Sequence, residues 1–162
     1  MAGQAPTQRR SGPLYTPEQR VRRDRTAWTL VQGILAPVQF LVFLISLVLV
    51  VRYLATGEGL WLATVSIVVK TGFLYLIMVT GAIWEKAVFG QYLLAEAFFW
   101  EDVFSFGVIA LHTAYLWALF SGATPETQMY IALAAYAAYV INAAQFLLKL
   151  RAARLDAQAV LA

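Results

Sequence analysis

The chain has 162 residues, of which 61% are hydrophobic and 13% are charged, and its mean hydropathy is +0.68. Soluble domains carry about twice that share of charged residues, so an ordinary soluble fold is excluded. Cysteine is absent, which excludes disulfides, thiolate metal sites and a cysteine nucleophile. The formal charge of +3 comes from basic residues that flank apolar segments, so it indicates binding to anionic lipid headgroups and not to nucleic acid.

The N-terminal segment, residues 1–27, is polar and basic, and its first part is rich in Pro, Gly, Gln and Ser, which predicts disorder. The stretch TPEQ then predicts a short helix, because Thr16 can cap it, Pro17 suits its first position and Gln19 completes a capping box. A similar start, TPET at residues 124–127, precedes the last apolar segment.

Four apolar segments follow, each long enough to cross a hydrocarbon core of about 30 Å, which takes roughly 20 helical residues. We therefore expect an all-α, polytopic membrane protein, with a four-helix transmembrane bundle at 28–150 and a cytoplasmic C-terminal tail at 151–162. The predicted spans are Trp28–Leu54, Leu60–Trp84, Phe98–Phe120 and Gln128–Leu150.

Basic residues are unevenly distributed among the connections between these spans. Six arginines precede the first span, Lys86 lies in the second connection, and Lys149, Arg151 and Arg154 lie at or just beyond the end of the fourth span. The other two connections have only Arg52 between them. By the positive-inside rule, both termini and the second connection are expected in the cytoplasm.

Polar side chains inside a span are costly, so each needs a partner, a water-filled cavity or a task. Gln39 belongs to a seven-residue polar repeat in the first span, which indicates either interhelical hydrogen bonds or the lining of a cavity. Lys70 and His112 lie near mid-depth, and we expect them to share a layer with Gln39. The fourth span has a second polar face, which includes Tyr136, Tyr139, Asn142, Gln145 and Lys149.

Acidic residues gather at the predicted cytoplasmic end, with Glu85 closing the second span and Glu101 and Asp102 opening the third. With Trp84 and Trp100 they form either an interfacial belt or a catalytic cluster. Glu101 and His112 are eleven residues apart and thus share a helix face. A carboxyl group that faces a low-dielectric bundle tends to keep its proton, which predicts a proton donor.

His112 is the only histidine, which excludes bis-histidine haem and leaves a structural role or a single axial bond to a tetrapyrrole metal. The sequence contains neither GxxxxGK[ST] nor GxGxxG, so nucleotide binding has no support. The polar groups indicate a cavity that opens to the cytoplasmic side and suits a flat, conjugated ligand.

Several stretches taken together resemble the 3-vinyl bacteriochlorophyllide hydratases, membrane enzymes of bacteriochlorophyll biosynthesis in phototrophic bacteria. They are LYTPEQRVRRD, WTLVQGILAPVQFLVFLISL, IVVKTGFLYLIMVTGAIWEKAVFGQYL, AFFWEDVFSFGVIALHTAYL and AYVINAAQFLLKLRAARL, and they cover most of residues 14–155. The resemblance implies a hydro-lyase without a cofactor that adds water to the C3-vinyl group of a (bacterio)chlorophyllide, giving a 3-(1-hydroxyethyl) group. It further implies the bacterial inner (intracytoplasmic) membrane and other pigment-biosynthesis enzymes as partners.

For that reaction we predict that Glu101 protonates the vinyl group, while Asp102 or Glu85 positions water and stabilises the cation. His112 is expected to bind the substrate magnesium or a ring carbonyl, or, as an alternative, to act as the acid. Lys86 or a juxtamembrane arginine is expected to meet the substrate propionate. The remaining predicted substrate-binding residues are Gln39, Lys70, Trp84, Trp100, Tyr139, Asn142 and Gln145.

Two other functions remain open at this point. One is a non-catalytic membrane subunit that binds a tetrapyrrole or pigment, in which the polar groups serve only as ligands and bundle contacts. The other is a small transporter that uses Lys70 and the acids as a relay, although four spans without inverted-repeat character disfavour it.

Overall fold

The computed structural model describes residues 12–161, and over that range it contains helices and loops but no strand. The helices are α1 (Pro17–Arg25), α2 (Ala27–Thr56), α3 (Leu60–Phe89), α4 (Phe99–Phe120) and α5 (Pro125–Leu161). Helices α2 to α5 are each long and apolar enough to cross a membrane, so this is a multi-pass membrane protein. The tail predicted to be disordered, with Arg9 and Arg10, lies outside the described residues.

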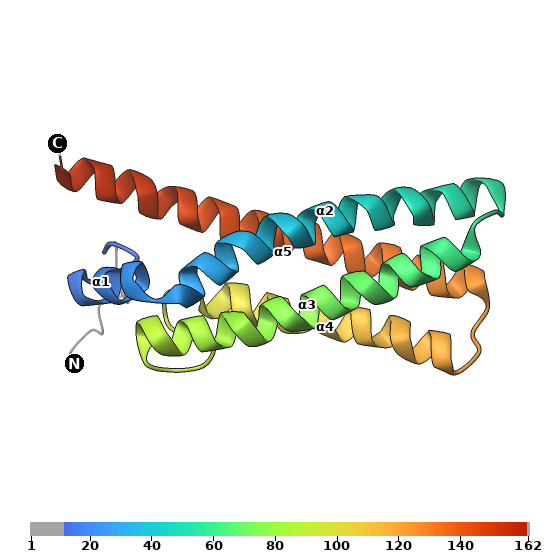
Figure 1. Cartoon of the computed structure of the whole chain (residues 1–162), viewed down its shortest axis with the longest axis horizontal. Coiled ribbons are helices and arrows are strands. Elements are labelled where there is room, and N and C mark those ends of the chain that lie inside the picture. The colour runs from blue at the N-terminus through green and yellow to red at the C-terminus, as the bar shows by residue number, and fades with distance from the viewer. Residues whose placement is uncertain (1–11, 162) are drawn as a thin grey trace, which may run out of the picture.

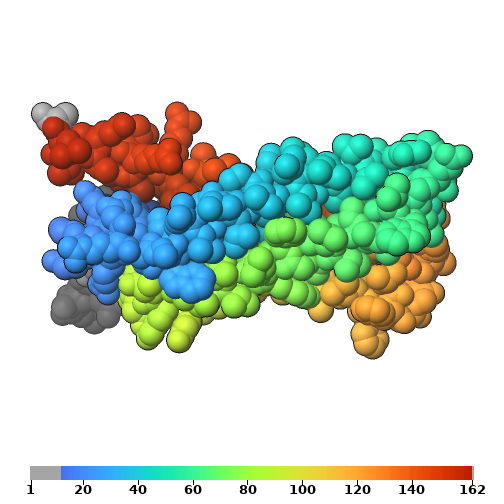
Figure 2. All heavy atoms as spheres, in the orientation of Figure 1, coloured from blue at the N-terminus to red at the C-terminus, as the bar shows by residue number. Residues whose placement is uncertain are grey.

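The bundle consists of two helical hairpins. Helix α2 packs mainly on α3 and α4 mainly on α5, and the hairpins meet through α2 with α5 and α3 with α4. Helix α1, the C-terminal part of α5 and the α3–α4 connection lie at one end of the molecule, and the other two connections lie at the opposite end (Figure 1). The molecule is elongated along the helices, and α5 extends beyond the bundle (Figure 2).

Both predicted helix starts are confirmed. Thr16 Oγ1 accepts a hydrogen bond from the Gln19 N–H at 3.2 Å, and Gln19 Oε1 accepts one from the Thr16 N–H at 2.9 Å, which completes the capping box. At the start of α5, Thr124 Oγ1 accepts from the Thr127 N–H at 3.3 Å.

Three helices extend beyond the predicted membrane spans. Helices α2 and α3 continue as far as Gly57 and Gly90, which end them in the left-handed conformation, with φ of 73° and 87°. Helix α5 does not end at Leu150 but continues to Leu161, so the described part of the predicted 151–162 tail is helical. The stretch RAARLDAQAVL contains no glycine or proline and is rich in Ala, Leu and Arg, which favour helix.

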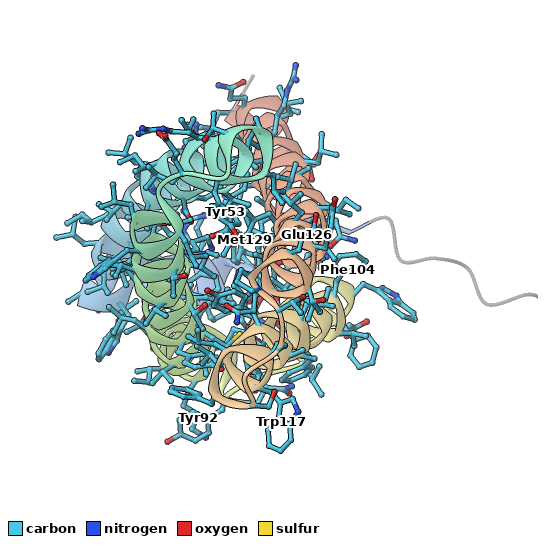
Figure 3. The ribbon with its side chains drawn as sticks, turned by 90° about the vertical axis from the view of Figure 1, so that its right-hand side faces the viewer. Tyr53, Tyr92, Phe104, Trp117, Glu126 and Met129 are labelled. Atoms are coloured by element: carbon cyan, nitrogen blue, oxygen red, sulfur yellow. The ribbon has the colours of Figure 1, made fainter. Side chains whose placement is uncertain are left out.

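The main core lies between the helices of the bundle. Phe43 of α2 packs against Tyr136 and Tyr139 of α5, with ring centroids 5.3 and 5.0 Å apart. In a view along the bundle, Met129 faces the interior and Trp117 faces outwards (Figure 3), in agreement with their exposed fractions of 0% and 76%. An apolar exterior of this kind suits contact with lipid.

A second, smaller cluster fixes α1 to the end of the bundle that carries the acidic residues. Tyr15 stacks on Phe89 with centroids 5.8 Å apart, and Phe98 packs between Trp84, Phe89 and Phe146. Burial raises the pKa of the Tyr15 phenol above its ordinary value, and the Arg23 guanidinium, 4.8 Å from the ring, opposes that shift. This aromatic cluster forms one wall of the candidate site.

Candidate active site

Three carboxyl side chains meet where α3 ends and α4 begins. Glu85 lies in the last turns of α3, and Glu101 and Asp102 lie in the first turn of α4, whose dipole favours negative charge. Their exposed fractions are only 5%, 8% and 3%, so covering side chains must move before a substrate can reach them. The α3–α4 connection, residues 90–98, brings the two helix ends together.

The Glu85 and Asp102 side chains are in hydrogen-bonding contact with each other. An ionised carboxylate can only accept hydrogen bonds, so contact between two of them requires a proton on one. The two groups therefore hold that proton as a unit.

The connecting loop is bonded to both of these acids. The Leu94 N–H donates to Asp102 Oδ2 at 2.8 Å, and the Ala95 N–H donates to Glu85 Oε2 at 3.3 Å. Leu94 has φ of 60°, in the left-handed region that a non-glycine residue enters at a cost of about 1–2 kcal/mol. The two hydrogen bonds to the acids help to hold the loop in this conformation.

Glu101 has a different partner. Lys149 Nζ of α5 donates to Glu101 Oε2 at 2.7 Å, in an ion pair whose side chains are 28% and 10% exposed. Asn142 Nδ2 and Ser105 Oγ both donate to the Glu101 backbone carbonyl, at 3.0 and 2.8 Å. These bonds fix the first turn of α4 to α5 and hold the Glu101 carboxylate against an ammonium group.

The predicted residues around the acids have distinct environments. The Trp84 indole N–H donates to Thr29 Oγ1 at 2.9 Å, so Trp84 is held within the structure. Lys86 Nζ donates to the Gly90 carbonyl at 2.8 Å, and Gln145 Oε1 lies 3.4 Å from Asn142 Nδ2. Trp100, in contrast, is 71% exposed.

The other predicted residues are buried among the helices of the bundle. Lys70 Nζ lies 3.6 Å from the centroid of the Tyr139 ring, and Gln39 forms a hydrogen bond with the Tyr139 side chain. His112 is fully buried, its Nδ1 lies 2.8 Å from the Val108 carbonyl oxygen, and Lys70 acts on it electrostatically. A bond from His112 to a substrate metal would require the helices to separate.

The predicted helix face that joins Glu101 to His112 is confirmed, since both residues and Ser105 and Val108 between them are buried. Eleven residues of helix separate the two by about 16 Å, at about 1.5 Å per residue. The sequence did not reveal the pairing of Glu101 with Lys149, although the polar face of the fourth span contained Lys149. It offered no signal for the backbone donors of Leu94 and Ala95.

Residues 12–161 contain no group of three or more His, Asp or Glu side chains placed to hold a metal ion. A shallow surface hollow lined by Leu60, Trp61, Thr64 and Val65 lies at the opposite end of α3 from Glu85.

Comparison with known proteins connects this site to a chemistry. Residues 15–152 match the family model of 2-vinyl bacteriochlorophyllide hydratase. A protein of that name from Cereibacter sphaeroides is 77% identical over 146 residues, which is 90% of this chain and 91% of the relative. One from Rhodobacter capsulatus is 75% identical over 144 residues, covering 89% and 84% of the two chains. No solved structure is detectably similar.

Identity at this level over nearly the whole of both chains decides among the three functions that the sequence left open. A non-catalytic pigment-binding subunit and a small transporter are set aside, and an enzyme remains. The chain belongs to the 2-vinyl bacteriochlorophyllide hydratase family and is a hydro-lyase.

Proposed function

We propose that this enzyme adds water to the vinyl group of a bacteriochlorophyllide-type macrocycle to give a 1-hydroxyethyl group, at the cytoplasmic face of the bacterial inner membrane. The vinyl position called 2 in the relatives' names and 3 in the resemblance is one position in two numbering schemes of the macrocycle. The observation that carries the mechanism is the buried contact between the Glu85 and Asp102 carboxyl groups.

The reaction needs one proton donor and one proton acceptor. A proton adds to the terminal vinyl carbon and forms a new C–H bond, which leaves positive charge on the carbon attached to the conjugated ring. Water adds its oxygen to that carbon and releases a proton. The acid that gave the first proton is therefore restored by the second, and no external reductant or oxidant is consumed.

In this proposal the Glu85–Asp102 pair performs both proton transfers. It holds one proton between two carboxyl groups, gives that proton to the vinyl group and then has two negative charges to stabilise the cation. The proton released from the added water returns to the pair. Glu101, which the sequence favoured as donor, serves instead to anchor α4 to α5, because its carboxyl group is engaged by Lys149 Nζ at 2.7 Å.

An exposed aromatic surface beside the acids suits a flat substrate. Tyr92, Phe99 and Trp100 lie in the loop and the first turn of α4, with exposed fractions of 61%, 41% and 71%. Their rings can stack on a macrocycle at the membrane surface. Lys86, at the adjacent end of α3, or a nearby arginine of α1 is suited to bind the propionate carboxylate.

The test uses the purified full-length protein in lipid nanodiscs with a vinyl bacteriochlorophyllide. We expect a hydroxyethyl product that contains ¹⁸O when the reaction is run in H₂¹⁸O, and one deuterium in the new methyl group when it is run in D₂O. Mass spectrometry measures both labels. A pigment that binds but returns unchanged would contradict the proposed activity, and a product without the deuterium would contradict protonation of the terminal carbon.

A further inference from the structure

Four buried side-chain atoms have no hydrogen-bond partner among residues 12–161. One is Tyr115 Oη of α4. The other three are Gln39 Oε1 of α2, Lys70 Nζ of α3 and His112 Nε2 of α4, whose side chains have exposed fractions of 4%, 0% and 0%. Unpaired polar atoms are rarely left in a packed interior, and within a membrane they mark a functional or solvated site.

The three side chains lie against two neighbouring tyrosines of the fourth helix of the bundle, Tyr136 and Tyr139 of α5. Lys70 Nζ lies 3.6 Å from the centroid of the Tyr139 ring, and the Gln39 side chain forms a hydrogen bond with Tyr139. His112 interacts electrostatically with Lys70, and its ring centroid lies 5.9 Å from the ring centroid of Tyr136. All four membrane helices thus contribute to the cluster.

The hydrogen bond of the His112 imidazole shows which of its two nitrogen atoms is a donor and which is an acceptor. His112 Nδ1 lies 2.8 Å from the Val108 carbonyl oxygen, which can only accept, so Nδ1 carries the hydrogen. In the neutral ring Nε2 then presents a lone pair. The cluster therefore offers two acceptors, His112 Nε2 and Gln39 Oε1, and one donor, the Lys70 amino group.

A water molecule suits this set better than an ion does. An anion would face the lone pairs of His112 Nε2 and Gln39 Oε1, and a metal cation would find no group of acidic or imidazole ligands there among the described residues. A water molecule can donate to both acceptors and accept from Lys70. We propose that Gln39, Lys70 and His112 hold an internal water molecule that links α2, α3 and α4 at the centre of the membrane.

This water is separate from the water that is consumed in the reaction. His112 lies about 16 Å along α4 from Glu101, by eleven residues at about 1.5 Å each, and Val108 fills the face between them with no exposed surface. The proposal does not depend on the proposed function. It assigns to Lys70 and His112 a role in holding the bundle, where the sequence predicted contact with the substrate.

The single histidine of the chain makes the site open to a direct test. Protein labelled with ¹⁵N-histidine, purified without a histidine tag and placed in lipid bilayers, gives one imidazole in solid-state NMR spectra. We expect a hydrogen on Nδ1, the ¹⁵N shift of a hydrogen-bonded acceptor at Nε2, and magnetisation transfer from water to the ring. A non-bonded Nε2, a doubly protonated ring, or the absence of water transfer would overturn the proposal.

Two variants of the same labelled protein separate a bridging water from a direct bond between Lys70 and His112. Lys70→Met and Gln39→Leu each remove one partner of the water, so both should reduce the transfer from water to His112. The matched control is Gln32→Leu, because Gln32 lies on the same stripe of α2 but donates to Thr80 Oγ1 at 2.7 Å. Unchanged transfer in both test variants, or an equal loss in the control, would contradict a water shared by these three residues.

Discussion

Replacing Glu85 with glutamine tests the proposed acid most directly, because the change keeps the shape of the side chain. The amide oxygen that Glu85→Gln introduces can still accept from the Ala95 N–H, which donates to Glu85 Oε2 at 3.3 Å in the unaltered protein. The new amide NH₂ can donate to the ionised Asp102 carboxylate, so the contact no longer requires a proton. Glu85→Gln should therefore fold normally and lack the proton that the reaction needs.

The expected loss follows from the size of general acid catalysis. A positioned acid contributes about 100-fold to 10,000-fold in rate, which corresponds to ~3–5 kcal/mol in the activation free energy. Substrate binding should change little, because the exposed aromatic surface at Tyr92, Phe99 and Trp100 is untouched. The variant should thus bind the vinyl pigment and turn it over at least about 100 times more slowly.

The assay compares single-turnover rates, pigment binding and melting temperature in nanodiscs. Glu96→Gln is the matched control, since it makes the same substitution at an exposed residue of the same loop and should retain the wild-type rate. Asp102→Asn should lose about as much as Glu85→Gln, and the double variant little more, because the pair acts as a unit. A Glu85→Gln rate within about tenfold of wild type, with binding intact, would refute the pair as the acid.

Three further predictions address residues around the pair and beyond it. Glu101→Gln removes the partner of Lys149 and should lower the melting temperature while reducing turnover by about tenfold or less; a loss as large as that of Glu85→Gln would restore Glu101 as the donor. His112→Ala should lower the melting temperature and leave the absorption spectrum of bound pigment unchanged, because His112 is fully buried; a spectral shift would indicate metal ligation. Thr16→Ala breaks the capping box and should destabilise α1 by about 1 kcal/mol, measured as faster amide hydrogen exchange in α1 with turnover retained; unchanged exchange would contradict the cap's contribution.

Much of the fold was predictable because hydropathy and helix caps are local signals. The four spans follow from the apolar runs, and the starts at Thr16 and Thr124 follow from side chains that cap their own helices. The extension of α5 to Leu161 was missed for a physical reason. The last turns of α5 are polar, so the sequence indicates a tail there. Hydropathy marks where an apolar span ends but does not show whether the helix continues outside the membrane.

The site was predictable only in part, because partner choice depends on how the helices are rotated against one another. Periodicity correctly placed Glu101 and His112 on one face of α4. It could not show that Glu101 contacts Lys149, 48 residues away, or that Asp102 contacts Glu85 across the loop. The amide donors of Leu94 and Ala95 belong to the backbone, which no side-chain pattern represents.

Two polar clusters could face the vinyl group in the proposed mechanism: the acids at the loop end of the bundle, and Lys70 with His112 at mid-depth. Their charges indicate which of the two it faces. The contact between Glu85 and Asp102 requires one proton, so that pair carries one negative charge, and Glu101 is paired with Lys149. When the pair protonates the vinyl group, the negative charge that it gains lies beside the new cation, so no charge is separated across the membrane. At mid-depth Lys70 has no carboxylate partner among residues 12–161, so no negative charge beside it would balance the new cation. An unbalanced positive charge within the membrane is costly, so the vinyl group should face the acids at the loop end of the bundle.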